Sequence, residues 1–270
     1  MSATRVFNGF WNGFQGFQDP DAPPATPLDQ TPEYVNFVTL AFAGTAPHSG
    51  FTTSYLCKNY PADTIIAWAK TLQDKGQKVL MSIIDNEDNQ WDKVDIPRFA
   101  KEASEVIIDK WGLDGVDIDS ESEGSSAEIF TQLIQEFRER MGPLGSGRYV
   151  TFDSYLFSSE DQEILAATKD DLDWVNLMAY FAQYEYMITL FQSYSSLVGP
   201  QKVTIGVKPG RGGGDQSTPL DEVARLARYQ PPEGDKKRGM MMYALTRDLP
   251  FYTDHPEWTW TETIHDNQTD

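Results

Sequence analysis

Short apolar runs rich in β-branched and aromatic residues alternate along the whole chain with longer amphipathic segments. Each run has the length and composition of a buried strand, and the distance between runs suits a strand followed by a helix. The sequence therefore predicts eight strands joined by helices. The runs span residues 5–11, 35–44, 78–85, 113–121, 149–157, 174–180, 203–209 and 239–245.

The segments between the runs carry the start and stop signals of helices. Asp95 followed by Pro97 is typical of a helix start, and Ser125 stands in capping-box register with Glu128. Gly76 follows an amphipathic segment at the position of a helix end. Helices are predicted within residues 62–76, 95–112, 125–142 and 217–229, whereas the polar residues 262–270 are predicted to fray.

Strands that alternate with helices predict a parallel sheet in an α/β fold. We expect this sheet to close into a single (β/α)8 TIM barrel that forms one domain over residues 1–270. An open, doubly wound sheet is the rival, but no Gly-x-Gly-x-x-Gly motif follows the first run. Glycines at 210–214 follow the seventh run and lack the lysine and serine of a phosphate-binding loop, so a flexible loop over the barrel mouth is predicted there.

The charge balance narrows the class of partner. The chain has 22 Lys and Arg against 41 Asp and Glu, which gives a formal net charge of −19. Because such a surface repels phosphate backbones and anionic lipid, we expect no nucleic-acid and no membrane partner. No apolar run approaches the roughly 18 residues of a membrane span. A neutral partner such as a glycan is compatible with this charge.

Few residues are available for metal binding or disulfide chemistry. Cys57 is the one cysteine, and His48, His255 and His265 are scattered without the spacing of metal ligands. We therefore predict neither a metal nor another cofactor. The N-terminal sequence MSATRVFNGF lacks the layout of a signal peptide, and the localisation stays open. The sequence also leaves the oligomeric state open.

An acidic row interrupts the fourth run, LDGVDIDSE. On a strand side chains alternate between two faces, so Asp117, Asp119 and Glu121 share one face, while Val116 and Ile118 share the other. In a barrel, the apolar pair would meet the helices and the carboxylates would point inward. The sequence thus predicts three carboxyl groups in line inside the barrel.

Three carboxylates in a low-dielectric interior repel one another and raise one another's pKa. A structural role would need buried partners, and a metal site would need further ligands, so acid–base catalysis is the favoured reading. Glu121 ends the run at the barrel mouth, where barrel enzymes place their chemistry. A raised pKa would keep Glu121 protonated, as a general acid requires.

The segment DGVDIDSE, residues 114–121, resembles the DGxDxDxE signature of glycoside hydrolase family 18, which comprises chitinases and certain endo-β-N-acetylglucosaminidases. The signature falls on the predicted fourth strand, as in the family. Weaker similarities occur in LAFAG at 40–44, MAY at 178–180 and GMMMY at 239–243. The resemblance implies a TIM barrel with glycosidase activity and is compatible with a secreted protein.

Several departures from the chitinase pattern stand out. Ser120 replaces the usual aromatic residue, Phe181 the usual Asp, and Tyr243 the usual Trp, and residues 82–86 read SIIDN instead of Ser-x-Gly-Gly. These features, with KVLMSIIDNED and GLDGVDIDSE, resemble bacterial endo-β-N-acetylglucosaminidases, which cut the N,N'-diacetylchitobiose core of N-glycans. The resemblance therefore favours a glycan or glycoprotein substrate.

The resemblance also implies a retaining mechanism in which the substrate's own 2-acetamido group attacks C1 and forms an oxazolinium intermediate. Glu121 would act as the acid and then the base, Asp119 would orient the acetamido N–H, and Asp117 would support Asp119. Tyr180 would hold the acetamido oxygen. A two-carboxylate mechanism stays open, with Asp85, Glu87, Asp88 and Asp153 near other strand ends as possible partners.

Aromatic and polar residues at or just past the strand ends are candidates for glycan binding. Tyr243 is the expected sugar platform, because it takes the place of the chitinase Trp. The other candidates are Trp11, Asn86, Glu87, Tyr155, Gln183 and Tyr184.

Two alternatives to an endo-β-N-acetylglucosaminidase stay open. A chitinase would cleave β-1,4-N-acetylglucosamine oligomers, but the missing aromatic residues argue against it. A non-catalytic barrel of the same family would bind glycans without cleaving them. Such proteins usually lose part of the acidic signature, which this chain retains in full.

Overall fold

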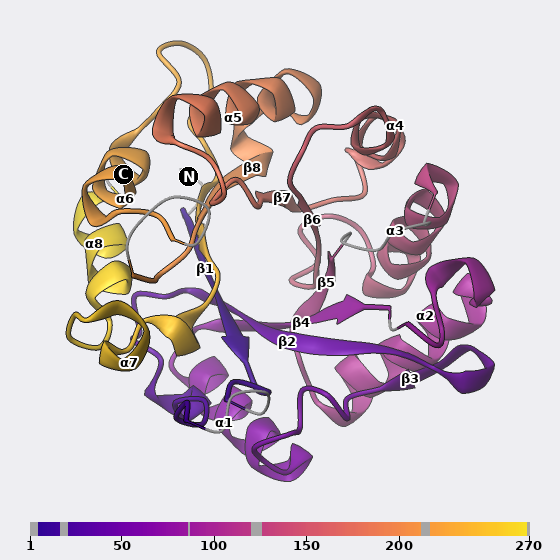
Figure 1. Cartoon of the computed structure of the whole chain (residues 1–270). Helices are drawn as coiled ribbons and strands as arrows, with labels where there is room; N and C mark the ends of the chain where they lie inside the picture. Colours follow the sequence, from indigo (N-terminus) through magenta and orange to yellow (C-terminus); the bar gives the residue numbers. More distant parts are fainter. Residues whose placement is uncertain (1–4, 17–20, 86, 120–125, 212–216, 269–270) are drawn as a thin grey trace.

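A computed structural model describes residues 5–16, 21–85, 87–119, 126–211 and 217–268. Eight parallel strands form a closed barrel, because β1 pairs with both β9 and β2 (Figure 1). The (β/α)8 prediction is confirmed, and each predicted run overlaps one of these strands, although β1 and β2 continue beyond the ends predicted for them. They are β1 Val6–Asn12, β2 Phe37–Ala46, β4 Lys78–Ile84, β5 Gly115–Asp119, β6 Tyr149–Ser154, β7 Trp174–Leu177, β8 Val203–Val207 and β9 Gly239–Met242.

A short strand that the sequence pattern did not predict lies outside the barrel. Strand β3, Gly50–Thr52, pairs antiparallel with the end of β2, with Gly44 opposite Thr52. It extends β2 into a two-stranded arm beyond the rim of the barrel (Figure 1). Three residues are too few for an alternating pattern to become visible in a sequence.

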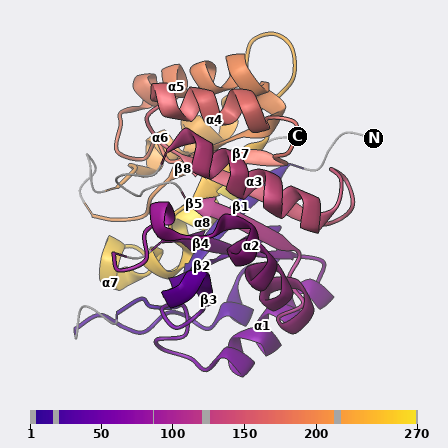
Figure 2. The same cartoon turned by 90° about the vertical axis from the view of Figure 1, so that its right-hand side faces the viewer.

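Helices surround the strands on the outside (Figure 2). They are α1 Ala62–Asp74, α2 Ile96–Ser104, α3 Ala127–Met141, α4 Ser159–Thr168, α5 Tyr184–Val198, α6 Leu220–Arg228, α7 Pro250–Thr253 and α8 Thr259–Asn267. A π-helical turn, Glu105–Lys110, continues α2. Short 3₁₀ turns lie at Leu28–Gln30, Pro47–Ser49, Trp91–Lys93, Pro200–Lys202 and Leu245–Arg247.

Two of the predicted helix boundaries are informative. Asp95 caps α2 as predicted, because its side chain accepts a hydrogen bond from the Arg98 N–H at 3.2 Å. The cap of α3 is Ser126, which accepts from the Ile129 N–H at 3.3 Å. The prediction of Ser125 as this cap was therefore wrong by one residue, and Ser125 itself lies outside the described residues.

The prediction of a frayed C-terminal segment was also wrong over most of its length, because α8 continues to Asn267. The helix is held by its apolar side: Trp260 and Ile264 are buried, and the Trp260 indole N–H donates to the Thr218 carbonyl at 2.8 Å.

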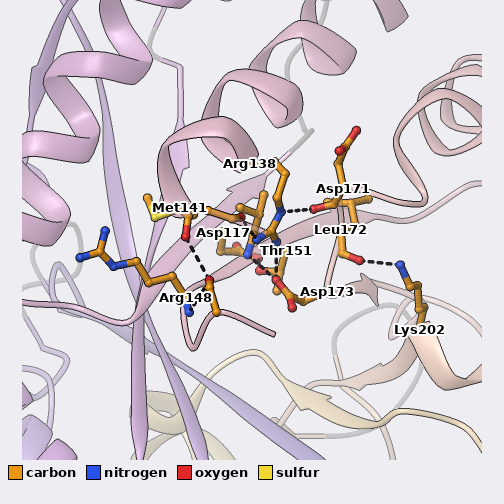
Figure 3. Close-up of polar contacts among 12 residues, drawn as sticks. Asp117, Arg138, Met141, Arg148, Thr151, Asp171, Leu172, Asp173 and Lys202 are labelled. Carbon is orange, nitrogen blue, oxygen red and sulfur yellow. Dashed lines mark hydrogen bonds and ion pairs between the residues drawn. The ribbon is translucent and has the colours of Figure 1, made fainter. Parts of the chain in front are cut away.

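An ion pair links two other parts of the outer layer. Arg138 of α3 and Asp173, just before β7, form this buried pair at 2.5 Å (Figure 3).

The interior of the barrel is layered. Apolar side chains fill its amino-terminal end, and a polar layer lies above them, as the inward-facing positions of successive strands predict. The lower layer contains Val6, Phe37, Leu80 and Trp174. The polar layer contains Asn8, Thr39, Ser82, Asp117, Thr151, Asn176 and Thr204, all buried. On the opposite face of β5, Val116 and Ile118 join the core beneath the helices, as predicted.

A buried lysine lies shortly before β9, next to the end of α6. Lys237 is 2% exposed, and its ammonium donates to the Ala227 carbonyl at 2.7 Å and the Tyr229 carbonyl at 2.6 Å, where α6 ends. Burial, with a smaller contribution from the nearby Arg5, lowers the pKa of Lys237 to about 7. The folded chain therefore releases this proton more readily than the unfolded chain does.

Because the unfolded chain binds more protons between the two pKa values, Lys237 should make the free energy of unfolding rise with pH from about 7 toward 10. The contribution is at most about 1.4 kcal/mol per pH unit. Urea denaturation of Lys237→Met across this range should lack the rise. Lys75→Met, which alters an exposed lysine at the end of α1, should keep it. Identical pH slopes for wild type and Lys237→Met would contradict the assignment.

Candidate active site

Asp117 lies at the centre of the polar layer and is fully buried. Its carboxyl accepts hydrogen bonds from Ser82 Oγ at 2.7 Å, from Thr151 Oγ1 and from Asn176 Nδ2 at 3.3 Å (Figure 3 shows Thr151 beside it). Burial raises the pKa of Asp117, and these donors oppose the rise. Two of the donors come from β4 and β6, which flank β5, and the third comes from β7 beyond β6, so the barrel itself fixes the orientation of this carboxyl.

Asn176 on β7 joins two of the carboxyl groups. Its side-chain oxygen accepts from the Trp174 indole N–H at 2.9 Å and from Thr204 Oγ1 at 2.8 Å. These two donors fix the amide so that its NH₂ group faces Asp153 at 2.8 Å and Asp117 at 3.3 Å. The amide is therefore a rigid donor to both acids.

Asp153 is the acid whose importance sequence reasoning underestimated. It lies opposite Asp119 in the parallel register of β5 and β6 and is 1% exposed. Burial, followed by the negative charges of Asp117 and Asp119, raises the pKa of Asp153 well above its usual value. The Asp153 and Asp117 side chains also share a hydrogen bond. A protonated Asp153 that donates to Asp117 accounts for both the raised pKa of Asp153 and the hydrogen bond between the two side chains.

A pocket of about 190 Å³ opens above these acids, at the carboxyl ends of the strands. Asp119 and Asp153 lie in it, and the Tyr180 and Tyr243 rings stack at 6.1 Å and 11°. Asp119, Tyr180 and Tyr243, which sequence reasoning chose from three different strands, are thus brought together. The remaining lining residues are Phe10, Phe42, Met178, Phe181, Lys208 and Met241.

Lys208 is a pocket residue that sequence reasoning did not single out. It follows β8, and its ammonium lies 5.9 Å from the ring centroids of both Tyr180 and Phe181. A cation here offsets part of the negative charge of the acids and is able to donate to a glycan oxygen. No motif marks it in the sequence, because only the closure of the barrel brings the end of β8 to the acids.

A second pocket, of about 330 Å³, adjoins the first on the side of β6 and β7. Met178 and Phe181 line both pockets. Two predicted glycan-binding residues, Tyr155 and Gln183, lie in this second pocket. The two pockets thus form one continuous surface around Phe181.

Other predicted residues lie elsewhere. Trp11 is 1% exposed, and its indole N–H donates to the Thr26 carbonyl at 2.7 Å in the outer core. Tyr184 packs under the Arg225 guanidinium, 3.7 Å from its ring centroid. Neither these two nor the exposed Glu87 is among the described residues that line the two pockets. Glu121 and Asn86 lie outside the described residues.

Two further features concern metal binding and membrane insertion. Within the described parts of the chain, no group of three His, Cys, Asp or Glu side chains is arranged to hold a metal ion. No helix in those same parts has both the length and the apolar character needed to cross a bilayer.

Comparisons with known proteins agree with the TIM-barrel fold. The family model for the endo-beta-N-acetylglucosaminidase EndoS TIM-barrel domain matches residues 10–242. Endo-beta-N-acetylglucosaminidase F2 from Elizabethkingia meningoseptica is 26% identical over 196 residues, which cover 66% of this chain. The match covers 57% of that relative's own length, so the chain corresponds to little more than half of it.

Solved structures show the same fold. A glycoside hydrolase family 18 chitinase from Pseudoalteromonas aurantia superposes with a TM-score of 0.73 at 20% identity, over 98% of this chain and all of the other. A mutant endo-beta-N-acetylglucosaminidase from Cordyceps militaris, in complex with fucosyl-N-acetylglucosamine-Asn, superposes with a TM-score of 0.70 at 19% identity. That comparison covers 98% of this chain and 91% of the other.

Proposed function

Because the chain belongs to glycoside hydrolase family 18, within the family of the EndoS TIM-barrel domain, we propose that it hydrolyses the N,N'-diacetylchitobiose core of N-glycans. The observation that carries this proposal is the convergence of Asp119, Tyr180 and Tyr243 on one pocket above a buried acid network. A carboxylate, a phenol and an aromatic face are the groups that a reacting N-acetylglucosamine needs. The pocket lies at the carboxyl ends of the strands, where barrel enzymes act.

The proposed reaction is retaining and substrate-assisted. Glu121 protonates the oxygen that leaves with the second N-acetylglucosamine, while the carbonyl oxygen of the 2-acetamido group attacks C1 of the first. The C1–O bond breaks and an oxazolinium ion forms. Glu121 then removes a proton from the water that attacks C1, and the bond between C1 and the acetamido oxygen breaks. This step regenerates the 2-acetamido group and the acid, and the two displacements at C1 retain the configuration.

The described residues have matching tasks in this scheme. Asp119 accepts a hydrogen bond from the acetamido N–H and stabilises the positive charge that develops on the oxazolinium ring. The Tyr180 hydroxyl donates to the acetamido oxygen, and the Tyr243 ring lies under the sugar. Asp117, held by Ser82, Thr151 and Asn176, supports Asp119 from below.

The test is mass spectrometry of a high-mannose and a complex-type glycoprotein after incubation with the protein. We expect the protein product to retain a single N-acetylglucosamine on each processed asparagine, because the cut lies between the two core sugars. Cleavage of chitin oligomers with both glycoproteins left intact would replace the proposal with a chitinase. Binding of glycans without any cleavage would indicate a non-catalytic barrel.

A further inference from the structure

The largest apolar side chains on the surface are not scattered. Six are exposed among the described residues, and four of these line the second pocket: Tyr155 at 37%, Leu156 at 55%, Phe181 at 45% and Tyr186 at 53%. We call these four residues, three aromatic side chains and one leucine, the aromatic shelf. Clustered apolar side chains on the surface of a soluble protein commonly mark a binding site.

The shelf continues the surface of the first pocket. Tyr155 and Leu156 follow β6, Phe181 follows β7, and Tyr186 lies in the first turn of α5 (Figure 1). The Phe181 ring contacts Tyr180 at 4.7 Å and Tyr155 at 6.4 Å between centroids. A row of aromatic rings therefore leads from the proposed acetamido site to the outside, and a ligand in the first pocket has direct access to the shelf.

The lining of the second pocket is mainly apolar, and its polar side-chain groups are the Tyr155 and Tyr186 hydroxyls and the Gln183 amide. Met178, Ala179, Ala182 and Leu190 complete it, and Gln183 contributes the one side-chain amide. A sugar ring carries hydroxyls around its rim, and those pressed against aliphatic side chains would lose their hydrogen bonds to water without replacement. An apolar amino-acid side chain has no such cost, and Gln183 is placed to pair with a peptide group beside it.

We propose that the aromatic shelf binds the polypeptide part of a glycoprotein substrate, through apolar side chains next to the glycosylated asparagine. The inference rests on the proposed function, since it requires a glycan that is attached to protein. It requires the shelf to lie on the leaving side of the scissile bond, where the second N-acetylglucosamine and its asparagine would be bound. It also accounts for Phe181, which stands where chitinases usually have an Asp.

The test compares two glycopeptides that carry the same glycan, one with Leu and Phe beside the asparagine and one with Gly and Ser. Burial of one such side chain should favour the apolar peptide about five- to tenfold in kcat/KM. The double variant Leu156→Ser/Tyr186→Ser should lose most of this preference. The matched control Leu144→Ser/Phe251→Ser, which removes the other two exposed apolar side chains, should keep it.

The possible outcomes separate the shelf from the proposed function. Equal kcat/KM values for the two peptides in the wild type would overturn the shelf proposal, as would a preference that survives in the shelf variant. A shelf variant that is equally impaired on both peptides and on the free glycan would make the shelf a sugar subsite instead. If no substrate is cleaved, the proposed function fails. Calorimetric Kd values for both peptides would still test the shelf, with the same preference expected.

Discussion

Replacing Glu121 with Gln should lower kcat/KM for glycan release by about a thousandfold, since proton transfer to the leaving group contributes roughly 10²–10⁴ in rate. The amide has the size of the acid but cannot protonate the leaving oxygen or remove the proton from water. Release is measured by mass spectrometry of the glycoprotein over time. The control is Glu105→Gln, which alters an exposed residue on the outer layer and should leave the rate unchanged.

A second substrate separates an acid from a residue with a merely structural role. A glycan on a nitrophenol leaving group needs little protonation, so Glu121→Gln should lose far less activity on that substrate in the step that breaks the bond. Equal losses on both substrates would indicate that the variant has damaged the pocket as a whole. Undiminished release from the glycoprotein would remove Glu121 from the mechanism.

The sequence predicts the acidic row because period-two alternation on a strand is a local property. Asp117, Asp119, Val116 and Ile118 each face the side that the pattern assigns to them. The sequence could not predict the partners of the row, because these depend on how neighbouring strands are aligned. The register that places Asp153 opposite Asp119 is set by the closure of the barrel and leaves no trace in either strand alone.

The alternation of side chains along a strand also explains why Trp11, a predicted glycan-binding residue, lies away from both pockets. Phe10 of β1 points into the pocket, as do the inward positions of the other strands, so Trp11 must point outward to the core beneath the helices. Strand β1 is buried on both faces, and its sequence VFNGFWN places an aromatic residue on each, so aromatic character alone does not reveal which face meets the pocket. In and just after β7, Asn176, Met178 and Tyr180 share one face by the same alternation, and the structure places all three toward the interior of the barrel.

Asp119→Asn should lower kcat/KM by about a hundredfold or more, whereas Asp153→Asn should cost about tenfold or less. In the proposed mechanism, Asp119 acts as an anion against the positive charge of the oxazolinium ion, and an amide cannot supply that charge. Burial and its two acidic neighbours raise the pKa of Asp153, so we expect its protonated form to be the one that supports Asp117. An asparagine there remains neutral and still donates to Asp117. Glycan release at pH 6–7 measures both losses.

The pH dependence of the same two variants tests the position of the proton. In the wild type, a rise in pH through the raised pKa of Asp153 adds a buried negative charge beside Asp117 and Asp119. The protonated carboxyl stabilises the folded state fully below the pKa that Asp153 has in the unfolded chain. This stabilisation is lost as the pH rises through the raised pKa of the folded state. Asp153→Asn lacks the ionisation, so it should keep both activity and free energy of unfolding to higher pH than the wild type does. If Asp153→Asn instead loses as much activity as Asp119→Asn at every pH, then Asp153 works as an anion, and the proton that the acids share lies on Asp117.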